Sequence, residues 1–179
     1  MPANANHVFR VLADPARRAI FECPARWQRN VSRTQPHNAP QKGLAMQIKL
    51  TSVFVDDQDK ALKFYTEVLG FAKKHEFSAG KYKWLTVVSL EEPEGVQLVL
   101  EPNSGYGDNN TAAKTYQQEI FRQGIPAANF FVGDVQKEYA RLKQHGVTFT
   151  KEPTKTTGST IAVLDDTCGN LIQITHLDW

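Results

Sequence analysis

The sequence after Met46 contains one pattern of elements twice, and this repeat constrains the fold more than any other feature. In each copy a β-branched run precedes a segment with helical spacing of apolar residues, and three strand-like runs follow. The string VDD at residues 55–57 corresponds to VGD at residues 132–134. The repeat predicts two βαβββ modules in tandem.

In the first copy, Asp57 is a candidate N-cap and Gly70 a candidate helix terminator. In the second copy Asp134 and Gly146 take these places. The first copy predicts a strand over 48–55, then a helix over 56–70, and then strands over 71–77, 81–90 and 95–102. The second predicts a helix over 133–146 between strands over 125–132, 147–153, 159–166 and 170–177, with a connecting helix over 111–124.

Residues 1–45 differ in composition from the rest of the chain. Apolar spacing over 8–20 predicts one helix, and the Arg-, Asn- and Pro-rich stretch 23–43 is typical of a disordered linker. Residues 7–22, which include the string LADPARR, resemble the start of ArsR-type winged-helix repressors. No recognition helix follows, so we expect residues 1–45 to be the remnant of a repressor or the result of a start codon assigned too early. We do not expect them to bind nucleic acid.

Bulk properties exclude several classes of protein. The formal net charge of +2 is too small to indicate a nucleic-acid or membrane surface, and no apolar run is long enough to span a bilayer. The two cysteines, Cys23 and Cys168, lie far apart, so we expect reduced thiols in a cytoplasmic protein.

The two modules of residues 46–179 resemble the vicinal-oxygen-chelate superfamily of glyoxalases, extradiol dioxygenases and bleomycin-resistance proteins. The resemblance rests on VFVDDQDKALKFYTEVLGF in the first module and on DDTCGNLIQI in the second. It implies an α+β fold in which two tandem βαβββ modules form curled mixed sheets around a cavity. It does not fix an activity, because this fold hosts enzymes and pure binding proteins.

In metal-dependent members of that superfamily, His and Glu side chains of the first and last strands of each module hold a divalent ion. Counted from the matching motifs, these positions are occupied here by Leu50, Ala127, Gln173, and either Val99 or Glu101. Leucine and alanine offer no ligand atom, and Gln173 is only a neutral oxygen donor. A divalent metal is therefore disfavoured, and we expect no cofactor.

Three histidines of residues 46–179 are candidates to replace the missing metal ligands: His75, His145 and His176. His145 ends a helix, where a cation complements the helix dipole, and His176 points to the opposite strand face from Gln173. His75 either points inward or belongs to a charged surface beside Lys73 and Lys74.

The remaining polar and aromatic residues indicate a pocket for a small organic ligand. Trp84 either lines this pocket or belongs to the core, and Glu101 either accepts hydrogen bonds from a ligand or lies exposed at a strand end. The candidate pocket residues are Trp84, Val99, Glu101, Phe130 (or Phe131), Gln173 and Thr175.

These residues favour a metal-free small-molecule-binding protein of the bleomycin-resistance type, in which a homodimer is expected. The alternative is a divergent glyoxalase-related lyase, isomerase or dioxygenase that uses Glu101 as a base or a residual metal ligand. Whether a reaction is catalysed stays open, as does the pairing of modules within one chain or between two.

Overall fold

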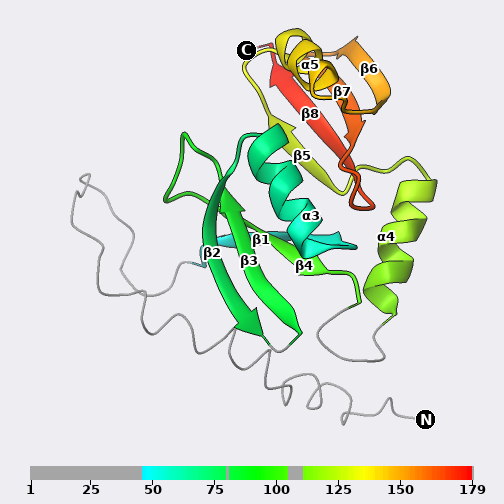
Figure 1. The fold of residues 1–179 in the computed structure, drawn as a ribbon. Coiled ribbons are helices and arrows are strands. Elements are labelled where there is room, and N and C mark those ends of the chain that lie inside the picture. Colours follow the sequence, from blue (N-terminus) through cyan, green and yellow to red (C-terminus); the bar gives the residue numbers. More distant parts are fainter. Residues whose placement is uncertain (1–45, 80, 105–110, 179) are drawn as a thin grey trace.

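The structure is a computed structural model that describes residues 46–79, 81–104 and 111–178 (Figure 1). The predicted helix over 8–20, the repressor-like segment 7–22, the linker and Cys23 lie outside the described residues. Within the described ranges, no helix is long and apolar enough to cross a membrane.

Two four-stranded mixed sheets with the same topology make up the fold, as the repeat predicts (Figure 1). Each sheet pairs its first and last strands in parallel and its other neighbours antiparallel. Sheet A has the order β1-β4-β3-β2, with β1 at Leu50–Val55, β2 at Ala72–Ala79, β3 at Tyr82–Val88 and β4 at Gln97–Pro102. Sheet B has the order β5-β8-β7-β6, with β5 at Ala128–Phe131, β6 at Phe149–Thr156, β7 at Ser159–Asp165 and β8 at Leu171–Leu177.

The helices that follow Asp57 and Asp134 begin where these capping residues predict. Asp57 accepts hydrogen bonds from the backbone N–H groups of Asp59 and Lys60 at 2.9 and 3.0 Å, and Asp134 accepts one from Lys137 at 3.0 Å. The helices are α3 (Gln58–Lys63), α4 (Ala112–Arg122) and α5 (Val135–Gln144). After α3 the chain continues as a π-helix, η2 (Phe64–Val68), which apolar periodicity did not predict.

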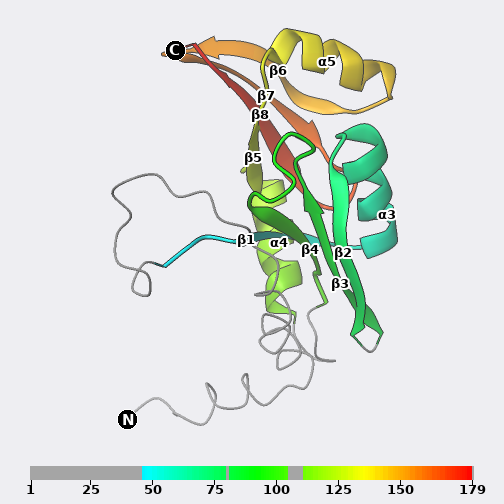
Figure 2. The same cartoon turned by 90° about the vertical axis from the view of Figure 1, so that its left-hand side faces the viewer.

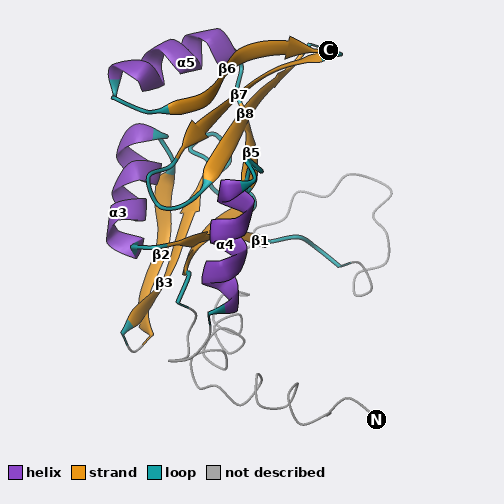
Figure 3. Cartoon of the chain, turned by 90° about the vertical axis from the view of Figure 1, so that its right-hand side faces the viewer, coloured by secondary structure: helices purple, strands orange, loops and turns teal. Residues whose placement is uncertain are grey.

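The hydrophobic core lies between the helices and one face of each sheet. Figures 2 and 3 show α3 and α5 on the same side of the molecule, each against its own sheet. Tyr65 of η2 is fully buried, and its ring lies 6.4 Å from that of Phe130 in sheet B. The cores of the two modules are therefore continuous.

The turn between β7 and β8 ties the modules together through buried polar groups. The Tyr65 hydroxyl donates to Asp166 Oδ2 at 3.0 Å, and the N–H groups of Cys168 and Asn170 donate to Asp166 Oδ1 at 2.8 Å. The Gln117 amide of α4 donates to the Cys168 carbonyl in this turn and to a carbonyl of β1. Each of these buried groups has its partner, as a buried polar network requires.

Candidate functional site

The two faces of sheet A have different environments because side chains alternate along a strand. In β4, Leu98 and Leu100 belong to the core cluster beneath α3. Val99 and Glu101 therefore point to the other face, which we call the distal face of sheet A. Trp84 lies on this face too, since its neighbour Leu85 in β3 is a core residue.

Trp84, Val99 and Glu101 share the distal face. Thr86 pairs with Val99, and Trp84 and Glu101 each lie two residues farther along their strands, beyond the last ladder pair between β3 and β4. Phe77 flanks Trp84 in β2 and Phe54 flanks Glu101 in β1. Val99 is buried, whereas Trp84 and Glu101 are half-buried. The structure thus places these three candidate residues on one face of sheet A, with Phe77 paired to Trp84 and Phe54 paired to Glu101.

Buried polar groups that the sequence analysis did not identify lie on the same face. The His75 backbone N–H donates to Thr86 Oγ1 at 3.1 Å, and the Thr86 hydroxyl donates to Gln97 Oε1 at 2.9 Å. Thr86 is two residues from Trp84, and Gln97 is two residues from Val99. The period of two along each strand was the signal that would have found them.

His75 lies at the outer edge of the distal face, in β2. Its ring stacks on Phe77 with 5.7 Å between centroids and an interplanar angle of 20°. Burial lowers the pKa of His75, and the positive charge of Lys74 lowers it further. The imidazole is therefore an uncharged hydrogen-bonding group at neutral pH.

Gln173 and Thr175 lie on sheet B, on the face turned away from α5. The Gln173 amide donates to Thr175 Oγ1 at 3.0 Å, and the Thr175 hydroxyl donates to Asn129 Oδ1 at 2.7 Å. The candidate residues therefore lie on both sheets, with Trp84, Val99 and Glu101 on sheet A and Gln173 and Thr175 on sheet B.

Phe130 lies on the opposite face of sheet B from Gln173 and Thr175. Its ring packs 5.1 Å from that of Phe71 and 6.4 Å from that of Tyr65, inside the core. Phe131 takes the position beside Thr175 and is 65% exposed. Phe130 therefore packs in the core, because alternation sends adjacent side chains to opposite faces. That Phe131, the alternative candidate, lines a pocket stays a prediction.

The residues at the family's metal positions do not form a ligand set for a divalent ion. Leu50, Ala127 and the buried Val99 have hydrocarbon side chains, and the amide of Gln173 donates to the Thr175 hydroxyl. Among the described residues, no three His, Cys, Asp or Glu side chains cluster as metal ligands would. Among these positions, only Glu101 supplies a carboxylate, and one carboxylate is too few ligands to hold a divalent ion.

In the described part of the chain, the other two histidines, His145 and His176, lie away from the distal face of sheet A. His145 is the C-cap of α5. His176 has its Nδ1 atom 3.2 Å from the carbonyl oxygen of Val132. The distal face thus offers aromatic surface, one carboxylate and buried amide and hydroxyl groups, which is the composition of a site for a small organic ligand.

Comparisons with known proteins agree with the fold. The profile of the family described as "Glyoxalase/Bleomycin resistance protein/Dioxygenase superfamily" matches residues 47–174. An uncharacterized Bacillus subtilis (strain 168) protein, YurT, is 58% identical over 129 residues, which cover 72% of this chain and 98% of YurT.

Solved structures show the same architecture. The structure of UcmS2 is 33% identical with a TM-score of 0.64, covering 76% of this chain and 100% of UcmS2. TnmS3, described as an antibiotic binding protein from Streptomyces sp. CB03234, is 25% identical with a TM-score of 0.56, covering 75% of this chain and 98% of TnmS3. The chain belongs to the glyoxalase/bleomycin resistance protein/dioxygenase superfamily.

Proposed function

We propose that the protein binds a small organic molecule on the distal face of sheet A, without a divalent metal. The observation that carries the proposal is the exchange of chemistry at the family's site. Leu50, Val99 and Ala127 have hydrocarbon side chains, while Trp84 and Glu101 lie on the same face of sheet A as Val99. Such a face binds by stacking and hydrogen bonding rather than by coordination.

The chemistry of the distal face favours an aromatic ligand that carries a cationic or hydroxyl group. An aromatic ring stacks on Trp84, and a positive charge or hydroxyl group binds the Glu101 carboxylate. The similarity to TnmS3, which is described as an antibiotic binding protein, supports binding of a small organic molecule.

A thermal-shift screen tests the proposal. The panel contains planar aromatic cations such as 9-aminoacridine, hydroxylated aromatic compounds, and the glycopeptide bleomycin. A ligand that binds only the native state raises the midpoint, by an amount that grows with its concentration. We expect shifts from the first two classes in the presence of EDTA. An absence of shifts across the panel, combined with turnover of a substrate that Glu101→Gln abolishes, would favour the divergent enzyme instead.

We further propose that the protein forms a homodimer. Large apolar side chains are exposed at Leu50 (43%), Phe77 (49%) and Phe131 (65%), on the distal faces of both sheets. An interface that covers them removes apolar area from water. Light scattering during gel filtration tests the dimer, and Phe131→Asp should shift the mass to that of a monomer.

A further inference from the structure

Sheet A is split at the level of Trp84 and Glu101. Strand β4 pairs with β1 along its whole length, and β3 pairs with β2 as far as Tyr82. Between β3 and β4, however, only Thr86 with Val99 and Val87 with Leu98 form ladder pairs. Pro102 contributes to this split because it has no N–H group to donate across it.

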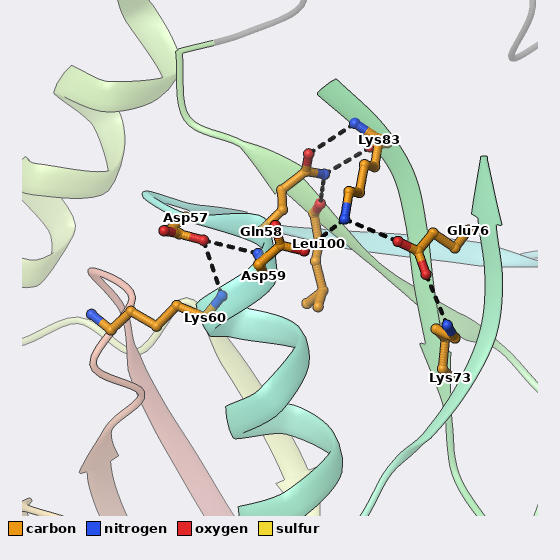
Figure 4. A network of polar contacts seen from close by, with 8 residues as sticks. All are labelled: Asp57, Gln58, Asp59, Lys60, Lys73, Glu76, Lys83 and Leu100. Atoms are coloured by element: carbon orange, nitrogen blue, oxygen red, sulfur yellow. Dashed lines mark hydrogen bonds and ion pairs between the residues drawn. The ribbon is translucent and has the colours of Figure 1, made fainter. Parts of the chain in front are cut away.

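The side chain of Gln58 fills the split from the helix side (Figure 4). Its Oε1 atom accepts a hydrogen bond from the Lys83 N–H at 2.9 Å. Its Nε2 group donates to the carbonyl oxygens of Lys83 and Leu100, both at 2.7 Å. Both amide hydrogens and one oxygen lone pair are used, so the side chain replaces a missing peptide group in the ladder.

The second module provides a natural comparison. Asp57 and Asp134 are equivalent N-caps, so Gln58 corresponds to Val135, the next residue of each helix. Val135 has no amide to insert, and in sheet B the ladder between β7 and β8 is continuous from Ser159 with Leu177 to Asp165 with Leu171. A split ladder therefore accompanies glutamine at this position, and a complete one accompanies valine.

The split lies directly behind the candidate ligand site. Lys83 and Leu100, which Gln58 joins, are the sequence neighbours of Trp84 and Glu101. Adjacent side chains point to opposite faces of a strand, so Trp84 and Glu101 lie on the face opposite to Gln58. The hydrogen bonds of Gln58 to the backbone of Lys83 and Leu100 therefore fix the distance between the two strands that carry Trp84 and Glu101. Nearby ion pairs from Lys83 to Asp59 (2.6 Å) and Glu76 (3.0 Å) are exposed, so they constrain this spacing weakly.

We propose that Gln58 is a positioning residue that sets the separation of Trp84 and Glu101, and through it the affinity of the distal face for an aromatic cation. The inference rests on the proposed function for its effect on binding. Its effect on Trp84 itself is independent of any ligand, so the two can be tested apart.

The test uses Gln58→Glu, which keeps the shape of the side chain and makes its hydrogen bonding depend on pH. A protonated glutamic acid offers one donor and one acceptor, whereas the ionised form offers no donor to the two carbonyls. Gln58→Met removes all three hydrogen bonds at every pH. Lys83→Met is the matched control, because it removes the ion pairs and leaves the backbone groups that bond to Gln58.

Binding of 9-aminoacridine is measured by calorimetry between pH 5 and pH 8, and each variant is compared with the wild type at the same pH. Trp84 emission is recorded on the same samples, in a Trp27→Phe, Trp179→Phe background. We expect Gln58→Glu to bind about tenfold more weakly than the wild type at pH 8 and to recover affinity toward the wild type as falling pH protonates the new carboxyl group, with a matching pH-dependent change of emission. Lys83→Met should stay within about twofold of the wild type.

Emission from Gln58→Glu that follows the wild type at every pH would overturn the inference. So would a change of emission without a change of relative affinity, since Gln58 would then be only structural. A wild type that binds no probe contradicts the proposed function, and the emission series then decides the inference alone. If Gln58→Met does not fold, the Gln58→Glu series at low pH keeps the test intact.

Discussion

The hydroxyl of Tyr65 donates a hydrogen bond to the carboxylate of Asp166 across the junction of the two modules, at 3.0 Å. Both residues are fully buried. Burial raises the pKa of Asp166, and the hydrogen bonds from Asn170, Cys168 and Tyr65 oppose that rise. The contact therefore matters for how the modules are held and for how stability depends on pH.

Replacement of Tyr65 by phenylalanine should destabilise the protein by about 1.5–3 kcal/mol at pH 7, the usual contribution of a hydrogen bond to a charged group. Tyr139→Phe is the matched control, because its hydroxyl bonds to Glu152 at 3.2 Å on the surface. The control should cost less than about 1 kcal/mol. Urea unfolding measures both, and equal costs would contradict the role given to the buried contact.

The cost of Tyr65→Phe should also depend on pH. A carboxyl with a raised pKa in the folded state binds its proton more tightly than in the unfolded chain, so it lowers stability as pH rises above its ordinary pKa of 3.8. Loss of a donor that lowers this pKa raises it further. The free-energy difference between Tyr65→Phe and wild type should therefore grow as pH rises through this window and level off above it. A difference that shrinks with rising pH would contradict the assignment.

Gly169→Ala should be more damaging than other glycine substitutions. Gly169 has φ +95°, and a Cβ atom there would lie 2.8 Å from Gln117 Nε2, which several hydrogen bonds hold in place. We expect a loss of about 3 kcal/mol or more, from backbone strain and a displaced buried amide. Gly146→Ala, with φ +78° and open space, should lose only about 1–2 kcal/mol. Gly133→Ala, which has open space and no positive φ, should change stability by less than about 0.5 kcal/mol. Thermal unfolding ranks the three, and any other order would contradict the packing described.

Glu101→Gln and Trp84→Ala should separate charge from stacking at the distal face. Glu101→Gln keeps the shape of the side chain and should lower the affinity for an aromatic cation by about tenfold. The affinity for a neutral hydroxylated aromatic compound should change little. Trp84→Ala should weaken both, because each stacks on the ring. Calorimetric titration of the two ligands gives the comparison. If Glu101→Gln lowers the affinity for both ligands equally, the charge of Glu101 does not contribute to binding of the cation.

A chain that begins at Met46 should keep the stability and ligand affinity of the full chain. The family profile matches from residue 47, and the 129 residues shared with YurT cover 98% of that protein. The midpoint of thermal unfolding and the elution volume are the measurements. A lower midpoint or a changed assembly would show that residues 1–45 contribute to the fold.

The element pattern was predictable from the sequence because its signals are local. Caps at Asp57 and Asp134 and glycine terminators at positions 70 and 146 depend on adjacent residues, and the structure confirms them. The π-helix over Phe64–Val68 was missed because its apolar spacing is also that of an α-helix.

The candidate site was only partly predictable. Period-two alternation correctly grouped Val99 with Glu101, but it gave no means of choosing between Phe130 and Phe131 in a short strand. Gln58 could not be found at all, because its partners Lys83 and Leu100 are 25 and 42 residues away in sequence. Side chains that complete a ladder between distant strands leave no local pattern.

We propose above all that the distal face of sheet A binds its ligand without a metal ion. The most direct test is calorimetric titration of EDTA-treated protein with 9-aminoacridine, repeated after addition of Mn²⁺ or Zn²⁺. The account predicts the same affinity in all three conditions, and an affinity at least about tenfold weaker in Trp84→Ala. Binding that appears only after a divalent metal is added, or that Trp84→Ala leaves unchanged, would contradict it.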